Sequence, residues 1–319
     1  MPLALTGAPL VPSRSLGSLV GMRALSFKLE SIQPTGSWLD RAAAHLVGEL
    51  TAGPRTVLGV VGAGPASQAL AAQCARIGRQ LVALVPLADS GQTGWLEAFG
   101  ARVLTVDADD TTLRDAAPGV LATVGGRYVD PCDAAWQAGL LELRGEISTE
   151  QRADALLALP SLLGQEATWL ALAAREGQAA VPLPLDGLGG EDERRILAVV
   201  GTEGEAFGRS SRASGIVQQP VCMREALAAQ RLLAREEGII TSVWGAAGLA
   251  ALFRVVQDDR REPLRARRLP RELSAVVVVT RELCDPGGPP LAPNELPKRT
   301  VSLAELQAGP AHLLIDASS

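Results

Sequence analysis

Short apolar runs alternate with longer amphipathic stretches along most of the chain. The apolar runs predict strands, whereas the stretches with an apolar residue at every third or fourth position predict helices. The predicted strands are Arg23–Leu29, Thr56–Val61, Gln80–Val85, Arg102–Val106, Ala155–Leu159, Arg195–Val200 and Ser274–Thr280. The predicted helices are Trp38–Leu50, Pro65–Ile77, Thr93–Phe99, Ala134–Arg144, Gln165–Arg175, Met223–Glu236 and Trp244–Val256.

This alternation is typical of βαβ units, in which a parallel sheet is covered by helices on both faces. The predicted fold class is therefore α/β. Three predicted helices are closely followed by a glycine (Gly78, Gly100 and Gly238), which suits a left-handed cap at a helix end. The proline-rich stretch Pro286–Pro297 predicts an extended excursion before a last strand, His312–Ile315.

Composition then narrows the classes of function. The 319 residues suffice for about two domains, and 47 % hydrophobic with 20 % charged residues is ordinary for a globular protein. A net charge of −5 provides no basic field for a nucleic-acid backbone. Widely spaced cysteines and only two histidines argue against a disulfide scaffold, a zinc site and a multi-histidine metal centre. The cysteines are Cys74, Cys132, Cys222 and Cys284.

The sequence shows no clear targeting or membrane-spanning segment. No uncharged apolar run approaches the ~20 residues that span a bilayer, and Met1–Val11 lacks the basic residues of a signal peptide. We therefore expect a cytoplasmic protein that binds neither a membrane nor nucleic acid. The arginine-rich stretch Asp258–Arg271 predicts a solvated linker, with a patch for phosphate or an acidic partner as the alternative.

The segment from Ser26 to Arg41, SFKLESIQPTGSWLDR, carries the most informative motif. A predicted strand ends at Glu30, and Pro34-Thr-Gly36 predicts a turn. Ser37 can cap a helix that begins at Trp38.

This segment resembles the signature of the fold-type-II pyridoxal-phosphate enzymes, and within them threonine synthase, where KxE precedes NPTGSFKDRG. The matching residues are Lys28, Glu30, Pro34, Thr35, Gly36, Ser37, Asp40 and Arg41. The resemblance implies that the lysine of the family's SFK forms an aldimine with the cofactor, and that position is Leu39 here. Leucine carries no amine, so it cannot form a Schiff base. Leu39 instead joins an apolar helical stripe with Ala43, Leu46 and Leu50, which favours a core residue.

The resemblance continues in order along most of the chain. The further similar segments are Gly7–Val11, Val60–Gly78, Phe99–Val103, Asp154–Pro160, Glu237–Ile239, Ala246–Ala251 and Val276–Pro286. They correspond to the family's TPL segment, its STGN element, its GAxV strand, its DAVVVP strand, its EGI and AAxLA motifs and its VVVxTGxGLKDP strand. The framework of the family is therefore kept.

Most of the implied cofactor contacts are altered. The family's asparagine beside the cofactor's 3-hydroxyl corresponds to Pro65, directly after the retained Gly64. The phosphate loop keeps only Gly164, and the leucines beside it restrict the close approach of an anion to the backbone. Thr280 corresponds to the hydroxyl that meets the pyridine nitrogen. The implied vestigial site is Ser37, Gly64, Pro65, Gly164 and Thr280, with no catalytic residue and no metal.

A second interpretation applies to Val60–Ser67, which follows a predicted strand and opens a helix as a dinucleotide fingerprint would. The third glycine of that fingerprint is Ser67 here, and the next strand ends without an acidic residue for a ribose. The alternative is a tight strand-to-helix turn with Pro65 at the first helical position, and this is favoured.

We therefore expect a fold-type-II architecture of two three-layer αβα domains with mostly parallel sheets. The larger domain is formed by 1–50 plus 145–319 and the smaller inserted domain by 51–144, with the family's site in the cleft between them. The predicted function is a threonine-synthase-like paralogue without aldimine chemistry. It would act by binding a small amino acid or phosphoester, or by assembling with a partner. We expect the protein to be a homodimer. Pyridoxal phosphate is expected to bind weakly or not at all, and never covalently.

Two alternatives remain. One is an active pyridoxal-phosphate enzyme, a threonine synthase or lyase, that uses another lysine, Lys28 or Lys298. The other is a nucleotide-binding oxidoreductase.

Overall fold

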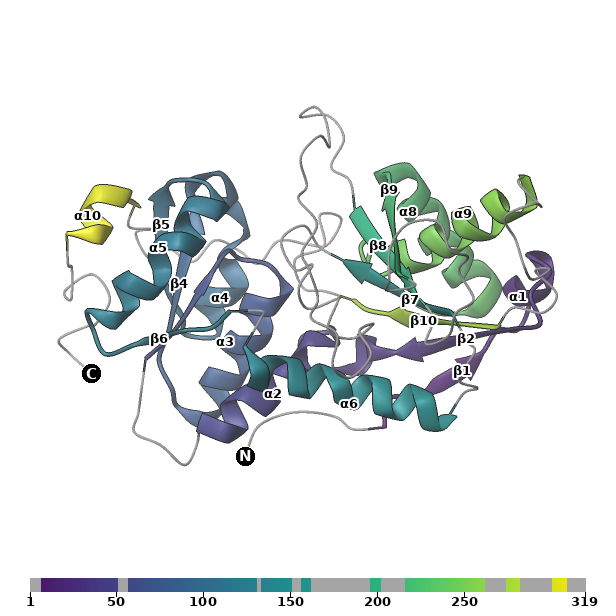
Figure 1. The fold of residues 1–319 in the computed structure, drawn as a ribbon, viewed down its shortest axis with the longest axis horizontal. Helices are drawn as coiled ribbons and strands as arrows, with labels where there is room; N and C mark the ends of the chain where they lie inside the picture. Colours follow the sequence, from purple (N-terminus) through teal and green to yellow (C-terminus); the bar gives the residue numbers. More distant parts are fainter. Residues whose placement is uncertain are drawn as a thin grey trace. The chain divides into compact units, whose positions relative to one another are not determined.

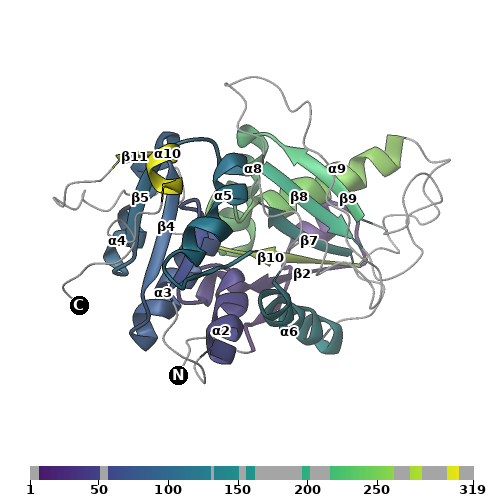
Figure 2. The ribbon, with the colours of Figure 1, turned by 60° about the vertical axis from the view of Figure 1, so that its left-hand side comes forward.

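The structure, a computed structural model, describes residues 7–50, 57–130, 133–150, 156–161, 196–201, 216–261, 274–281 and 300–308. The chain forms two compact units, each built around one sheet (Figures 1 and 2). The five-stranded unit contains Met1–Ala4, Leu39–Gly139 and Gly288–Ser319. The six-stranded unit contains Leu5–Trp38 and Leu140–Gly287.

The six-stranded sheet has the order β1-β2-β10-β7-β8-β9. Its strands are β1 (Leu10–Pro12), β2 (Ala24–Leu29), β7 (Leu156–Ser161), β8 (Ile196–Gly201), β9 (Ile216–Val221) and β10 (Ser274–Val279). The strands β2, β10 and β7 are parallel neighbours, whereas β1, β8 and β9 pair antiparallel. Because β10 lies between two parallel neighbours, all six of its residues are buried.

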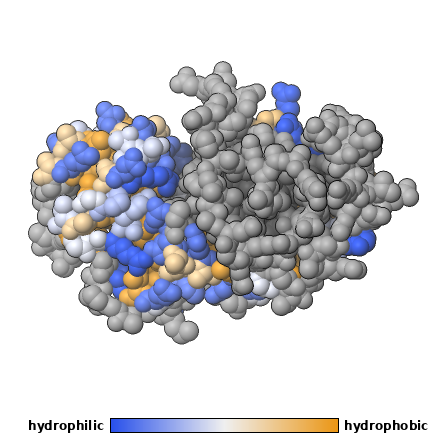
Figure 3. All heavy atoms as spheres, viewed as in Figure 1, coloured by the Kyte–Doolittle hydropathy of each residue, from blue (hydrophilic) through white to orange (hydrophobic). Residues whose placement is uncertain are grey.

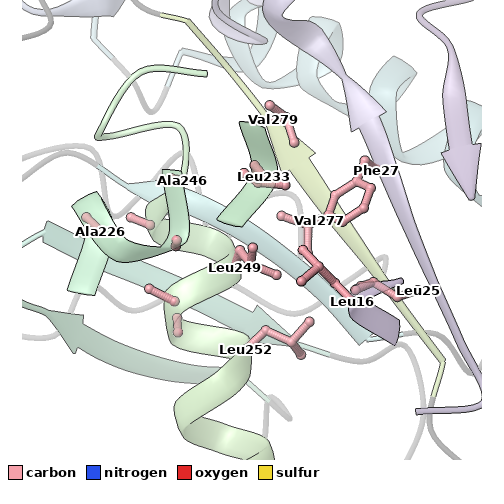
Figure 4. Close-up of a cluster of buried hydrophobic side chains, with 14 of the residues drawn as sticks. Leu16, Leu25, Phe27, Ala226, Leu233, Ala246, Leu249, Leu252, Val277 and Val279 are labelled. Carbon is pink, nitrogen blue, oxygen red and sulfur yellow. The ribbon is translucent and has the colours of Figure 1, made fainter. Parts of the chain in front are cut away.

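Helices cover this sheet. They are α1 (Leu16–Leu19), α8 (Met223–Leu232), the π-helical turn η3 (Leu233–Glu237) and α9 (Ala247–Arg261); a 3-10 turn, η1 (Glu30–Ile32), follows β2. Alternate residues of β2, Leu25 and Phe27, join Val277 of β10 in a buried cluster with α9. Figure 4 shows these side chains converging between the strands and the helix. Lys28, the residue after Phe27, therefore points to the opposite face of the sheet.

The five-stranded sheet has the order β11-β5-β4-β3-β6, and all its pairings are parallel. Its strands are β3 (Leu58–Val61), β4 (Leu81–Pro86), β5 (Arg102–Asp107), β6 (Arg127–Tyr128) and β11 (Thr300–Ser302). Its helices and turns are α2 (Leu39–Leu50), α3 (Pro65–Ile77), η2 (Leu87–Gln92), α4 (Gly94–Ala98), α5 (Asp110–Ala122) and α10 (Leu303–Gln307). Helices α5 and α10 bury one face of the sheet. Helix α6 (Ala134–Glu150) begins in this unit and ends in the other.

The predicted α/β fold with mostly parallel sheets is confirmed, since six of the nine described strand pairings are parallel. Each of the seven predicted strands begins and ends within two residues of an observed one. The three antiparallel pairings involve β1, β8 and β9 at the two ends of the six-stranded sheet. The five-stranded unit also contains 39–50 and 300–308, which the sequence analysis assigned to the larger domain. These segments join it because α2 packs on α3 and β11 pairs with β5. The predicted domain boundaries themselves stay a prediction.

Other local differences are small. The arginine-rich stretch, expected to be a linker, continues α9 as far as Arg261, where its description ends. The predictions for Gln165–Arg175 and His312–Ile315 lie outside the described residues. Within the described stretches, no helix combines the length and the apolar character that crossing a bilayer requires.

Candidate functional site

The turn that follows β2 is fixed against the end of β10. Gly36 adopts a φ of +77°, and a Cβ atom placed on it would lie 2.2 Å from the carbonyl oxygen of Arg281. The backbone N–H of Arg281 donates to the carbonyl of Gly36 at 2.8 Å. Only glycine meets both demands, the left-handed backbone and the close approach. The predicted turn around Pro34–Gly36 is therefore a tight joint between two parallel strands.

Thr280 lies at the same edge of the sheet, directly after β10. Its carbonyl accepts hydrogen bonds from the Thr241 hydroxyl at 2.7 Å and the Ser242 N–H at 3.2 Å. Gly245 packs directly against the same carbonyl, since a Cβ placed on it would lie 2.1 Å from the Thr280 carbonyl oxygen. Three segments thus meet where β2 and β10 end, and the carboxyl edge of parallel strands is where open α/β sheets bind ligands.

Among the described residues of this edge, the hydroxyl of Thr280 is a candidate contact for a ligand. The residue is completely buried, and its Oγ1 has no hydrogen-bond partner among the described residues. Buried polar groups almost always have a partner, so an unmatched hydroxyl in a native protein points to water or a bound molecule. Thr280 fits the hydrogen-bonding role that the sequence resemblance assigns to it.

Leu39, which the sequence resemblance sets against the family's lysine, is a buried core residue. It is the first residue of α2 and is 2 % exposed. Ala43 and Leu46 of the predicted stripe are also buried, and Leu50 is half-buried, so the predicted apolar stripe is confirmed. The helix begins one residue later than predicted, and the adjoining Ser37 is 1 % exposed. No side chain at this point supplies an amine.

Lys28 is held in a buried ion pair. Its side chain is fully buried in β2, and its Nζ lies 3.0 Å from Oε2 of Glu146 in α6. The other oxygen, Oε1 of Glu146, accepts a hydrogen bond from the N–H of Gly7 at 2.8 Å. A buried ammonium requires such a partner, because an unpaired charge in the interior costs several kcal/mol. The pair ties α6 and the segment before β1 to the face of the sheet opposite Phe27.

In the five-stranded unit, the turn Gly62–Gly64 leads from β3 into α3. Pro65 occupies the first helical position, as predicted for a simple strand-to-helix turn. Gly62 has a φ of +86°, and a Cβ placed on it would lie 3.6 Å from Oδ1 of Asp110. That carboxylate lies beside the turn, and its other oxygen accepts a hydrogen bond from Nε of Arg114 at 2.5 Å. A Cβ on Gly64 would meet no atom within 4 Å, so no packing requires glycine there.

The EGI motif has a structural role that the sequence did not indicate. The Glu237 carboxylate accepts hydrogen bonds from the Ser13 hydroxyl and from the N–H groups of Arg14, Ser15 and Leu16, at 2.7 to 3.2 Å. Partial burial alone would raise the pKa of Glu237, but the bonds from Leu16 and Ser13 outweigh it and hold that pKa below its ordinary value. We call this arrangement the Glu237 clamp.

The remaining candidate groups offer no chemistry. Burial raises the pKa of the Cys74 thiol to about 12, so it stays protonated and unreactive. His45 faces Glu49 at 3.3 Å on α2, as a half-exposed side chain. Among the described residues, no three His, Cys, Asp or Glu side chains gather as metal ligands would. Gly164, Lys298, Cys132 and Cys284 lie outside the described residues.

The structure brings the residue before Ser37 into contact with the residue after Thr280, and the predicted site itself stays a prediction. The Pro34–Gly36 turn, which leads to Ser37, meets the Thr280–Arg281 segment. Sequence reasoning missed Thr241, Ser242 and Gly245. Their signal is faint, because hydroxyl residues and a single glycine before a helix are common in loops.

Solved structures with a similar fold are enzymes. Diaminopropionate ammonia lyase from Escherichia coli, in its apo form, has a TM-score of 0.62 and 14 % identity, over 88 % of this chain and 85 % of that chain. A pyridoxal 5′-phosphate-dependent aspartate racemase has a TM-score of 0.58 and 18 % identity, over 86 % and 90 %. A lysine-to-alanine mutant of O-ureido-L-serine synthase with bound O-ureido-L-serine has a TM-score of 0.58 and 16 % identity, over 87 % and 88 %. At these identities the likeness concerns the fold.

No curated protein sequence matches the chain. A protein-family profile does: residues 1–178, more than half of the chain, match the family described as pyridoxal-phosphate dependent enzyme. That span includes the segment from Ser26 to Arg41 and both strand-to-helix turns discussed above. The chain belongs to the pyridoxal-phosphate dependent enzyme family.

Proposed function

We propose that this protein is a threonine-synthase-like member of its family that has lost aldimine catalysis and acts by binding a small ligand. The proposal is carried by Leu39, a buried leucine that the sequence resemblance aligns with the lysine of the family motif. Aldimine chemistry needs a primary amine on a side chain, and no protonation state of leucine supplies one. The rest of the motif, including the tight turn at Gly36, is kept as architecture.

The ligand is a small amino acid or a phosphoester, bound without a covalent bond. The unmatched Thr280 hydroxyl supports a binding role, because it provides a hydrogen bond that no described residue uses. The solved O-ureido-L-serine synthase mutant also supports it, since that chain of similar fold holds an amino acid although one of its lysines is replaced. As a homodimer, the protein would present two such sites.

The two alternatives have less support. An active enzyme would need an amine from another lysine, but the ammonium of Lys28 is fully buried and paired with Glu146. A nucleotide-binding oxidoreductase would need the third glycine of the dinucleotide fingerprint, and that position is Ser67 here. Titration with nicotinamide dinucleotides tests this second alternative directly.

Borohydride reduction of the purified protein after incubation with pyridoxal phosphate tests the proposal. Peptide mass analysis should find no pyridoxyl-lysine at stoichiometric yield, because Leu39 supplies no amine for an aldimine. Diaminopropionate ammonia lyase from Escherichia coli, taken through the same steps, is the positive control. A stoichiometric adduct on Lys28 or Lys298 would establish the active-enzyme alternative instead.

A further inference from the structure

The five-stranded sheet is completed by a segment from a distant part of the chain. We name residues 300–308, which form β11 and α10, the clip. The clip pairs in parallel with β5, and Thr300 lies opposite Thr105 with their hydroxyl oxygens 3.0 Å apart. Figure 2 shows β11 beside β5 at the edge of the sheet. Without the clip, β5 would be an open sheet edge.

The clip also covers apolar surface. Val301 and Leu306 are almost completely buried in the cluster that contains Val106 and Leu113. If the clip left, these side chains and the N–H and C=O groups of β5 would be exposed together. Such an edge is a template for pairing with another strand. Figure 3 shows that the described surface of this unit, with the clip in place, is a mixture of hydrophilic and hydrophobic residues.

Few contacts hold the clip, and it keeps its own local structure. The favourable contacts are three paired residues and two buried aliphatic side chains. They must offset the conformational entropy that nine residues lose when they become ordered. The Ser302 hydroxyl accepts from the Glu305 N–H at 3.2 Å, and the Glu305 carboxylate accepts from the Ser302 N–H at 2.8 Å. This capping box forms within the clip, so the segment can leave and dock as one unit.

The chain length before the clip allows it to reach another molecule. Residues 282–299 separate Arg281, the last described residue after β10, from Thr300. Eighteen residues span at most ~60 Å when extended. A clip released from its own β5 has the same sequence, and therefore the same fit, for the β5 edge of another copy.

We propose that the clip is detachable, and that the β5 edge beneath it is a docking site for the clip of a second copy of this chain. The exchange remakes the same pairing and the same burial between two molecules. It does not depend on what the ligand site binds, so it stands or falls separately from the proposed function.

Two single-cysteine variants test the exchange, each in a background without Cys74, Cys132, Cys222 and Cys284. Thr105→Cys is prepared with ¹⁵N and mixed with unlabelled Thr300→Cys under mild oxidation. Thr105 is 2 % exposed and its hydroxyl faces that of Thr300, so residue 300 of a second copy takes this place only when the original clip has left. We expect a 105–300 cross-linked peptide with one labelled and one unlabelled half, whose yield rises with protein concentration.

The matched control is Val60→Cys mixed with Ala83→Cys, register partners on the neighbouring strands β3 and β4. We expect at least tenfold more mixed-label cross-link from the clip pair. An equal yield from both pairs would overturn the exchange. The double variant Thr105→Cys/Thr300→Cys should form the bond within one molecule at low concentration, and failure to form it would overturn the pairing itself.

Discussion

At the scale of single residues, Gly36 meets two requirements, a left-handed backbone and a close approach to another backbone segment. A substitution would violate both, and each violation lowers the stability by a different amount. Replacement by alanine places an L side chain at a φ of +77° and a Cβ 2.2 Å from a backbone oxygen that cannot move freely. We expect Gly36→Ala to lower the free energy of unfolding by about 3 kcal/mol or more, measured by urea denaturation.

Gly238 is the matched control, since its φ is +71° but no atom lies within 4 Å of a Cβ placed there. Gly238→Ala should cost only about 1–2 kcal/mol, from the backbone alone. Equal losses for the two variants would show that the contact with Arg281 does not constrain Gly36.

Leu39 carries the second prediction at this scale. We expect that Leu39→Lys does not restore threonine synthesis from O-phosphohomoserine, because an amine alone does not hold a cofactor's ring and phosphate. The new ammonium enters a buried apolar stripe, so the variant should also unfold at a lower temperature.

Leu39→Met, of similar volume and without charge, separates the effect of charge from that of packing and should stay close to the native protein. Turnover of O-phosphohomoserine by Leu39→Lys at a rate typical of enzymes would contradict the proposed loss of the other cofactor contacts.

At the scale of elements, the Glu237 clamp holds the segment before α1. Glu237→Gln keeps the shape but removes the charge from four hydrogen bonds, so we expect a loss of about 1–3 kcal/mol at neutral pH. Because the pKa of Glu237 is lowered in the folded protein, the clamp's contribution is complete above the ordinary value of 4.5. It is lost as the pH falls through the folded pKa.

Denaturation curves of both proteins from pH 7 down to pH 3 measure this, and the difference between them should shrink in acid. Glu236→Gln is the control, because its partner Arg235 is 77 % exposed and such surface pairs contribute little. A gap between native and Glu237→Gln protein that is independent of pH would exclude the charge as its source.

The elements also mark the limit of what the sequence predicts. Buried strands such as β4 and β10 were located well, because runs of apolar residues leave few alternatives. Helix α5 was missed because Pro118 and Gly119 interrupt it, although Leu113, Ala117 and Leu121 repeat at helical spacing. Strand β9 was missed because it contains Pro220, which an edge strand tolerates.

The site shows the same limit. The Pro34–Gly36 turn and Thr280 stand out in sequence motifs, yet the contact of Gly36 with Arg281 joins residues 245 positions apart, which no local pattern encodes. The Glu237 clamp is equally invisible in the sequence, because its donors are backbone N–H groups that any residue carries.

At the scale of the whole molecule, we expect a homodimer that binds pyridoxal phosphate weakly. Sedimentation measures the first part and calorimetric titration the second. The affinity should be low because each missing backbone N–H partner of the phosphate costs ~1 kcal/mol or more. A monomer that binds the cofactor with submicromolar Kd would contradict both parts, and Thr280→Val should weaken whatever binding is found.

The pairing of β2 with β10 has a consequence for how the protein is made. Ala24 lies opposite Ser274, so β2 lacks its parallel neighbour until 250 further residues have left the ribosome. At ~5–20 residues per second, that wait lasts roughly 12–50 s. The strands β3, β4, β5 and β6 are complete within residues 58–128, so they can assemble during the wait. We expect nascent chains stalled before residue 274 to protect 58–128 from protease while the segment around Phe27 is still cut; equal protection of both would show that β2 finds another partner during synthesis.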